Sequence, residues 1–207
     1  MQSDRRSFLQ ITGGALVGAT LPFAAQAKFD ISPERAREVR FLGNEDAAVT
    51  VAEYFSMTCG HCGNFHRNTF SEVKEKLINT GIIRFEMHPF PLDQLALQAH
   101  ALCRVLPNAS YFKMVDVLLD QQQKWVRSED PVAKLKQYAK FAGISSEDYD
   151  DIMNNRAYLE TIVEIRQTAV VKHNVQSTPS FVINGEKTFG GAVSYEEFLA
   201  ELNAFGI

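Results

Sequence analysis

The sequence predicts an α/β fold in which a long helical segment interrupts a β-sheet domain. Three observations lead to this prediction. Residues 49–55 and 82–87 are rich in β-branched and apolar side chains, as in strands. Residues 92–173 have apolar side chains at helical spacing throughout. Strand character then returns at residues 180–189.

The first strands surround a C-x-x-C motif. A short lead-in precedes them and can end in a strand near residues 39–42. Residues 49–55 are apolar on both faces apart from Glu53, which is typical of a strand in the middle of a covered sheet. After Cys59-Gly60-His61-Cys62, apolar residues at intervals of four predict a helix that continues to about residue 80.

The middle of the chain predicts four or five helices. Pro131 stands at a first helical position, and Gly143 closes the same helix. Ser145-x-x-Asp148 can cap a short helix after it. The predicted helices cover residues 95–106, 111–123, 131–143, a short stretch after Ser145, and 156–172.

The last part returns to strands. Asn184-Gly185 is a strong hairpin signal between strands at 180–183 and 186–189. Ser194-x-x-Glu197 is a capping box for a final helix. The order β-β-α-β, helices, β-β-α is a thioredoxin-type arrangement with an inserted helical domain. The predicted division is an export signal at 1–27, a first sheet part at 28–91, the insertion at 92–173 and a second sheet part at 174–207.

The N-terminus predicts export. Arg5-Arg6 before Ser-Phe-Leu resembles a twin-arginine (Tat) motif, and residues 11–25 are moderately apolar and uncharged. Ala25-Gln26-Ala27 has the small-x-small form of a cleavage site, so we expect cleavage after Ala27. An uncleaved anchor is the alternative. Export would place the chain in an oxidising compartment, where a cysteine pair can cycle as a disulfide.

Composition argues against several partners. The net charge is −4, and lysine and arginine form no run. Neither nucleic-acid binding nor an electrostatic membrane anchor is therefore supported.

The cysteine pair suits thiol–disulfide exchange. A helix that begins between the two residues places Cys59 at its positive end, which favours a thiolate. Two thiols one helical turn apart can close and reopen a small disulfide. Zinc is the competing interpretation, because Cys59, Cys62 and His66 could supply three ligands, but no second C-x-x-C completes the set. A c-type haem site needs histidine directly after the second cysteine, and Gly63 occupies that position, so haem attachment is excluded.

These motifs together resemble the DsbA-like thiol:disulfide oxidoreductases. The resemblance is carried by Glu53-x-Phe55-Ser56, the C-x-x-C motif and Thr178-Pro179 before Phe-Val-Ile-Asn-Gly. It implies a thioredoxin-like α/β fold with an inserted all-helical domain. It also implies a periplasmic oxidoreductase that donates the Cys59–Cys62 disulfide to exported proteins.

The resemblance assigns roles to individual residues. Cys59 would be the nucleophile, Cys62 the resolving thiol, and His61 a group that stabilises the thiolate. Glu53 would transfer protons around the buried thiol, and Thr178-Pro179 would form a cis-proline loop that binds substrate backbone. No metal or cofactor is implied.

Partners and alternatives follow from the same resemblance. Cysteine-containing exported proteins would be substrates, a DsbB-type membrane protein could reoxidise the site, and a monomer is expected. Gly60-His61 between the cysteines is usual in disulfide isomerases, so an isomerase or reductase is an alternative; a non-catalytic binding or chaperone module is another. Cys103 is expected to be a small buried hydrophobe, and the histidines other than His61 are expected to be structural or surface residues.

Overall fold

The computed structural model describes residues 29–207 of the chain. The predicted export signal and its cleavage site after Ala27 lie outside the described residues. Within residues 29–207, no helix is both long enough and apolar enough to cross a membrane.

A mixed five-stranded sheet forms the centre of the fold, with strand order β1-β3-β2-β4-β5. β2 pairs in parallel with β3 and antiparallel with β4, and all but one of its residues are buried. The prediction of a central strand at 49–55 is therefore confirmed. The strands are β1 (Phe41–Gly43), β2 (Val49–Phe55), β3 (Ile83–Pro89), β4 (Ser180–Ile183) and β5 (Lys187–Gly190).

The helix after the cysteines is interrupted, which corrects the prediction of one continuous helix. α2 (Gly60–Asn68) ends at Thr69, whose φ of −118° leaves the helical range. The Thr69 hydroxyl donates to the carbonyl of Val193 at 2.8 Å, so a tertiary contact accompanies the break. A second helix, α3 (Phe70–Val73), and a π-helical turn (Lys74–Ile78) continue the segment.

Within residues 29–207, two further α-helices and a 3-10 helix (Asn203–Phe205) lie outside the inserted segment. α1 (Pro33–Arg37) was not predicted; Ser32 caps it by accepting a hydrogen bond from the Arg35 backbone N–H at 3.2 Å. α10 (Tyr195–Leu202) begins with the predicted Ser194 and Glu197 capping box.

Six helices lie between β3 and β4. The predicted helix at 111–123 is split at Gln121, where ψ is 11°, and this adds one helix to the predicted four or five. Asp93, Asp130, Ser145 and Asn155 cap four of them through their side chains. The helices are α4 (Gln94–Arg104), α5 (Asn108–Asp120), α6 (Gln122–Val126), α7 (Pro131–Phe141), α8 (Ser146–Asn154) and α9 (Arg156–His173).

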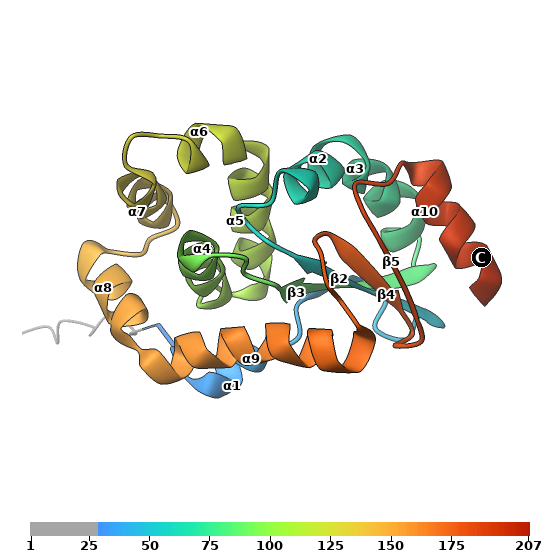
Figure 1. The fold of residues 1–207 in the computed structure, drawn as a ribbon, viewed down its shortest axis with the longest axis horizontal. Coiled ribbons are helices and arrows are strands. Elements are labelled where there is room, and N and C mark those ends of the chain that lie inside the picture. Colours follow the sequence, from blue (N-terminus) through green and yellow to red (C-terminus); the bar gives the residue numbers. More distant parts are fainter. Residues whose placement is uncertain (1–28) are drawn as a thin grey trace, which may run out of the picture.

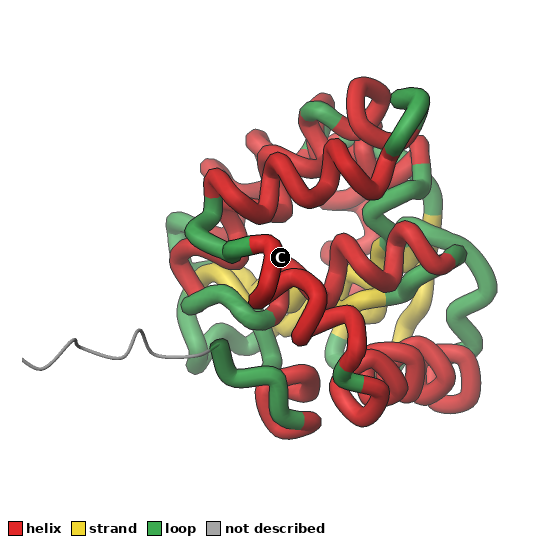
Figure 2. Tube along the Cα trace, turned by 90° about the vertical axis from the view of Figure 1, so that its left-hand side faces the viewer, coloured by secondary structure: helices red, strands yellow, loops and turns green. Residues whose placement is uncertain are grey.

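The helical segment and the sheet share one hydrophobic core. Figure 1 shows α4 to α8 gathered beside the sheet, while α9 runs from that group to the sheet and contacts β3. Figure 2 shows the strands enclosed among helices. Side chains of both parts belong to a single buried cluster, including Trp125 of α6 and Phe181 of β4. The helices are therefore packed against the region that carries the cysteines.

Candidate functional site

The C-x-x-C motif lies where the central strand ends and a helix begins. β2 ends at Phe55, a short loop leads to Cys59, and Cys59 is the N-cap of α2. The first helical hydrogen bond joins the Gly63 N–H to the Cys59 carbonyl at 3.1 Å. Cys59 is partly buried and Cys62 is fully buried, and both are free thiols. The sequence-predicted pair thus has one accessible and one inner sulfur.

The environment of Cys59 favours a thiolate. Hydrogen bonding from the Cys62 thiol is the largest cause that lowers the Cys59 pKa to about 5; partial burial opposes it. The Thr178 hydroxyl and the backbone N–H groups of Cys62 and His61 lower this pKa further. His61 thus contributes to the Cys59 pKa through its backbone, and a contribution from its imidazole stays a prediction.

Cys62 has the opposite acidity. Burial is the main cause that raises the pKa of the Cys62 thiol well above its usual range, and the charge of Glu53 raises it further. The Ser56 backbone N–H donates to Cys62 Sγ at 3.4 Å. The two sulfurs therefore differ in charge near neutral pH: Cys59 is a thiolate and Cys62 a thiol.

Thr178 and Pro179 lie beside Cys59, although they follow it by more than a hundred residues. The antiparallel register of β4 on β2 pairs Ser180 with Tyr54, so the residues just before β4 lie past the end of β2. In its protonated form Cys59 donates to the Thr178 carbonyl, which lies 3.2 Å from Cys59 Sγ, and the Thr178–Pro179 peptide bond is cis. The buried Thr178 hydroxyl makes no other hydrogen bond among the described residues, so it can donate to the Cys59 thiolate.

Glu53 is fully buried and faces His66. Glu53 Oε2 lies 3.1 Å from His66 Nε2, and Glu53 Oε1 has no hydrogen-bond partner within residues 29–207. His66 was expected to be a structural or surface residue, and its contact with Glu53 was not predicted. His66 follows Cys62 by four residues and therefore shares its face of α2, but its contact with Glu53 depends on how β2 and α2 pack.

The helical segment contacts the cysteine loop through two side chains that sequence reasoning missed. Gln122 Nε2 donates to the carbonyls of Met57 and Cys59, each at 2.9 Å. Thr58 Oγ1 donates to Asp93 Oδ2 at 2.7 Å. Neither contact has a signal in the sequence, because both depend on how α4 and α6 pack against the loop.

Other candidates lie elsewhere. Cys103 is fully buried, as predicted, and burial raises the pKa of its thiol.

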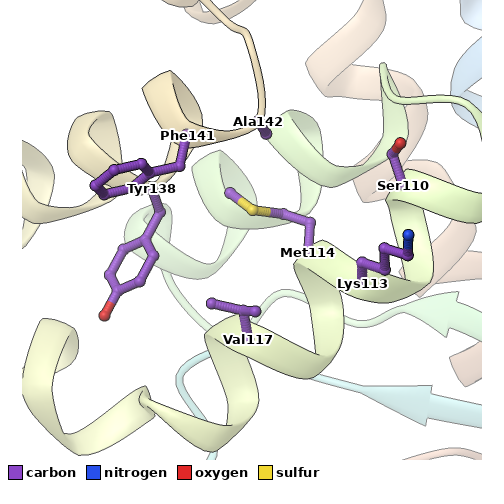
Figure 3. Close-up of a pocket in the computed structure, with 7 residues that line it drawn as sticks. All are labelled: Ser110, Lys113, Met114, Val117, Tyr138, Phe141 and Ala142. Carbon is purple, nitrogen blue, oxygen red and sulfur yellow. The ribbon is translucent and has the colours of Figure 1, made fainter.

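In the part of the chain that the structure describes, no three His, Cys, Asp or Glu side chains converge as a metal site would require. A largely apolar pocket of about 450 Å³ lies between α5 and α7, and none of the predicted site residues lines it (Figure 3).

Comparisons with known proteins agree with this arrangement. A model of the thioredoxin family, described as "Thioredoxin", matches residues 36–204. A structure of α-DsbA1 from Wolbachia pipientis superposes with a TM-score of 0.72 at 25% identity, covering 81% of this chain and 90% of that one. The thioredoxin-like α/β fold class, predicted with a helical insertion, is confirmed.

Relatives identified by sequence carry related names. A "putative protein-disulfide oxidoreductase" of Rickettsia bellii is 32% identical over 148 residues, which is 71% of this chain and 57% of that protein. "Thiol:disulfide interchange protein DsbL" of Escherichia coli is 26% identical over 161 residues, covering 68% of this chain and 70% of that protein. The chain thus matches little more than half the length of the Rickettsia relative.

Proposed function

This chain belongs to the thioredoxin family, and from that premise we propose that it is a protein thiol:disulfide oxidoreductase acting through Cys59 and Cys62. One observation carries the proposal: at the start of α2, an accessible thiol with a pKa of about 5 stands beside a buried thiol with a raised pKa. This difference suits exchange, since the outer sulfur is the better nucleophile near neutral pH and the better leaving group. The names of its relatives support the same activity.

In the proposed oxidase direction, the protein starts with a Cys59–Cys62 disulfide. A substrate thiolate attacks Cys59 Sγ, the Cys59–Cys62 bond breaks, and Cys62 leaves as a thiolate that takes up a proton. A second substrate thiolate then attacks the substrate sulfur of the mixed disulfide and releases Cys59 as a thiolate. Two electrons pass from the substrate dithiol to the cysteine pair. The stabilised Cys59 thiolate favours this direction, because it stabilises the reduced protein.

Proton transfer to Cys62 is the proposed role of Glu53. A thiol with a raised pKa cannot remain a thiolate in the buried site, so the departing Cys62 sulfur needs a proton. Glu53 is the buried carboxyl that interacts with Cys62; as the carboxylic acid it would pass its proton to the departing sulfur and become the carboxylate whose charge acts on the Cys62 thiol. His66, 3.1 Å from Glu53, is placed to hold that carboxyl in position.

Substrate binding is proposed for the Thr178-Pro179 loop. The Thr178 carbonyl lies 3.2 Å from Cys59 Sγ, next to the point where a substrate sulfur would be attached. A peptide in a mixed disulfide with Cys59 could therefore pair with the Thr178 backbone as an added strand does.

The cellular setting is proposed from the predicted signal and the relatives. We propose a periplasmic protein exported by the Tat route and cleaved after Ala27, which oxidises cysteine-containing exported proteins and is reoxidised by a DsbB-type membrane protein. The proposed mature chain is a monomer in which residues 92–173 are inserted between sheet parts at 28–91 and 174–207.

The test is oxidation of a reduced peptide that contains two cysteines. The wild-type disulfide form should oxidise it, and Cys59→Ser should abolish the reaction. Cys103→Ala, which removes a buried thiol outside the pair, is the matched control and should retain it. Oxidation that survives Cys59→Ser would refute the assignment.

Gly60-His61 favours an isomerase or reductase as the second candidate. The two functions differ in the stability of the Cys59–Cys62 disulfide, which is lower in an oxidase than in a reductase or isomerase. Equilibration of the pair with glutathione, together with rescrambling of a misfolded disulfide protein, separates them. A disulfide about as stable as that of a reductase would exclude the oxidase.

A further inference from the structure

Gln122 connects the helical segment to the loop that presents Cys59. It is the first residue of α6 and only 1% exposed. Its side-chain N–H₂ group donates to the carbonyls of Met57 and Cys59, both at 2.9 Å. These carbonyls precede Gln122 by 65 and 63 positions, so the contact is purely tertiary.

The two hydrogen bonds determine how the loop enters α2. One planar amide holds two carbonyls on either side of Thr58, which leaves the loop little freedom to rotate. The Cys59 carbonyl also accepts the Gly63 N–H at 3.1 Å, so Gln122 supports the same group that starts the helix. The orientation of this first turn decides where the His61 and Cys62 N–H groups point.

Gly63 provides an independent observation. A Cβ atom at position 63 would lie 2.6 Å from Gln122 Oε1 and 2.8 Å from Arg67 Nη1. These distances are shorter than van der Waals contact, so Gln122 occupies the space that any larger residue at 63 would need. Gly63 and the Gln122 amide are therefore in close contact, and a side chain added at position 63 would displace the amide.

We infer that Gln122 is a positioning residue: it holds the loop from Met57 to Cys59 so that the His61 and Cys62 N–H groups point at Cys59 Sγ. The helical segment thereby controls the reactivity of the cysteine pair from outside the sheet domain. The consequence for exchange rests on the proposed function, whereas the consequence for Cys59 ionisation does not.

The experiment replaces Gln122 with an unbranched apolar residue of similar length. Gln122→Met removes both donors, and Gln123→Met is the matched control because Gln123 is the exposed neighbour on the same short helix. Two quantities are measured: the pH midpoint of Cys59 alkylation in the reduced protein, and the equilibrium constant with glutathione. Gln122→Met should raise the midpoint and shift the equilibrium about tenfold toward the disulfide, which is the shift that one pKa unit produces. Gln123→Met should change neither.

Gly63→Ala tests the same contact from the opposite side. The new methyl group must displace the Gln122 amide, so the midpoint should move in the same direction as in Gln122→Met. The double variant should shift it by less than the sum, because both changes remove one contact. Circular dichroism and the thermal midpoint establish that each variant is folded.

The possible outcomes separate the two proposals. An unchanged midpoint in folded Gln122→Met or folded Gly63→Ala would overturn the role of Gln122. If wild-type protein does not exchange with glutathione at all, the proposed function fails, while the alkylation midpoint still decides the role of Gln122.

Discussion

The Cys62 thiol should control the acidity of Cys59, and two substitutions test this. Cys62→Ala removes the hydrogen bond that contributes most to the low Cys59 pKa, whereas Cys62→Ser keeps a donor of similar size. A hydrogen bond to a charged group contributes about 1.5–3 kcal/mol, which corresponds to about one to two pKa units. Since Cys59 is only partly buried, water offsets some of this loss, and the lower end is expected for Cys62→Ala.

The assay is the rate of Cys59 alkylation as a function of pH. The wild-type midpoint should lie near 5, with Cys62 unreactive because its pKa is raised. The midpoint of Cys62→Ala should rise to about 6, and that of Cys62→Ser should stay closer to the wild type. A midpoint that stays near 5 in Cys62→Ala would refute the reasoning, as would an equal rise in both variants.

Three further predictions concern ionisation and stability. Folding lowers the pKa of Cys59 to about 5. Between that pH and the ordinary pKa of a thiol, the Cys59 sulfur is therefore protonated only in the unfolded chain. The unfolding free energy of the reduced protein should therefore rise with pH there and lose this contribution below pH 5; Cys59→Ala, measured by urea unfolding, should remove this slope. Glu53→Gln should lower the pKa of Cys62, which is raised mainly by burial and further by the Glu53 charge; alkylation of Cys62 in a Cys59→Ala background measures this, and an unchanged midpoint would contradict it. Gly43→Ala should destabilise the protein by about 1–3 kcal/mol, because φ is +95° and the new Cβ would lie 2.4 Å from a β3 carbonyl. Gly143→Ala shares the positive φ but meets no atom within 4 Å, so its smaller effect in urea unfolding is the control.

Local signals in the sequence predicted most of the elements. The capping boxes at Ser145 and Ser194 and the hairpin at Asn184-Gly185 lie where they were predicted, because each depends on residues within one turn of the chain. Besides the unpredicted α1, two predicted helices are interrupted, at Thr69 and at Gln121. Apolar spacing passes through both positions without a break, and at Thr69 the interruption coincides with a contact to a distant loop.

The site residues, like the helices and strands, could be predicted from the sequence only in part. The sequence alone placed Cys59 at the start of a helix and Cys62 one turn deeper, since a strand, a C-x-x-C motif and a helical pattern follow each other directly. It predicted Glu53 on the central strand but not its partner, His66. A contact between a strand and a helix depends on how the two elements pack, and the apolar spacing within either element does not reveal that packing.

Tertiary structure alone decided what surrounds the two sulfurs. The β2–β4 register brings the Thr178 carbonyl to 3.2 Å from Cys59, and the packing of α6 brings Gln122 to the carbonyls of the loop. Sequence patterns express preferences over a few residues, whereas these contacts join segments separated by tens of residues or more. The sequence therefore determined which residues carry the proposed exchange and placed the Cys62 thiol one helical turn from Cys59, whereas the packing of distant elements determined how deeply each thiol is buried and which other groups surround it.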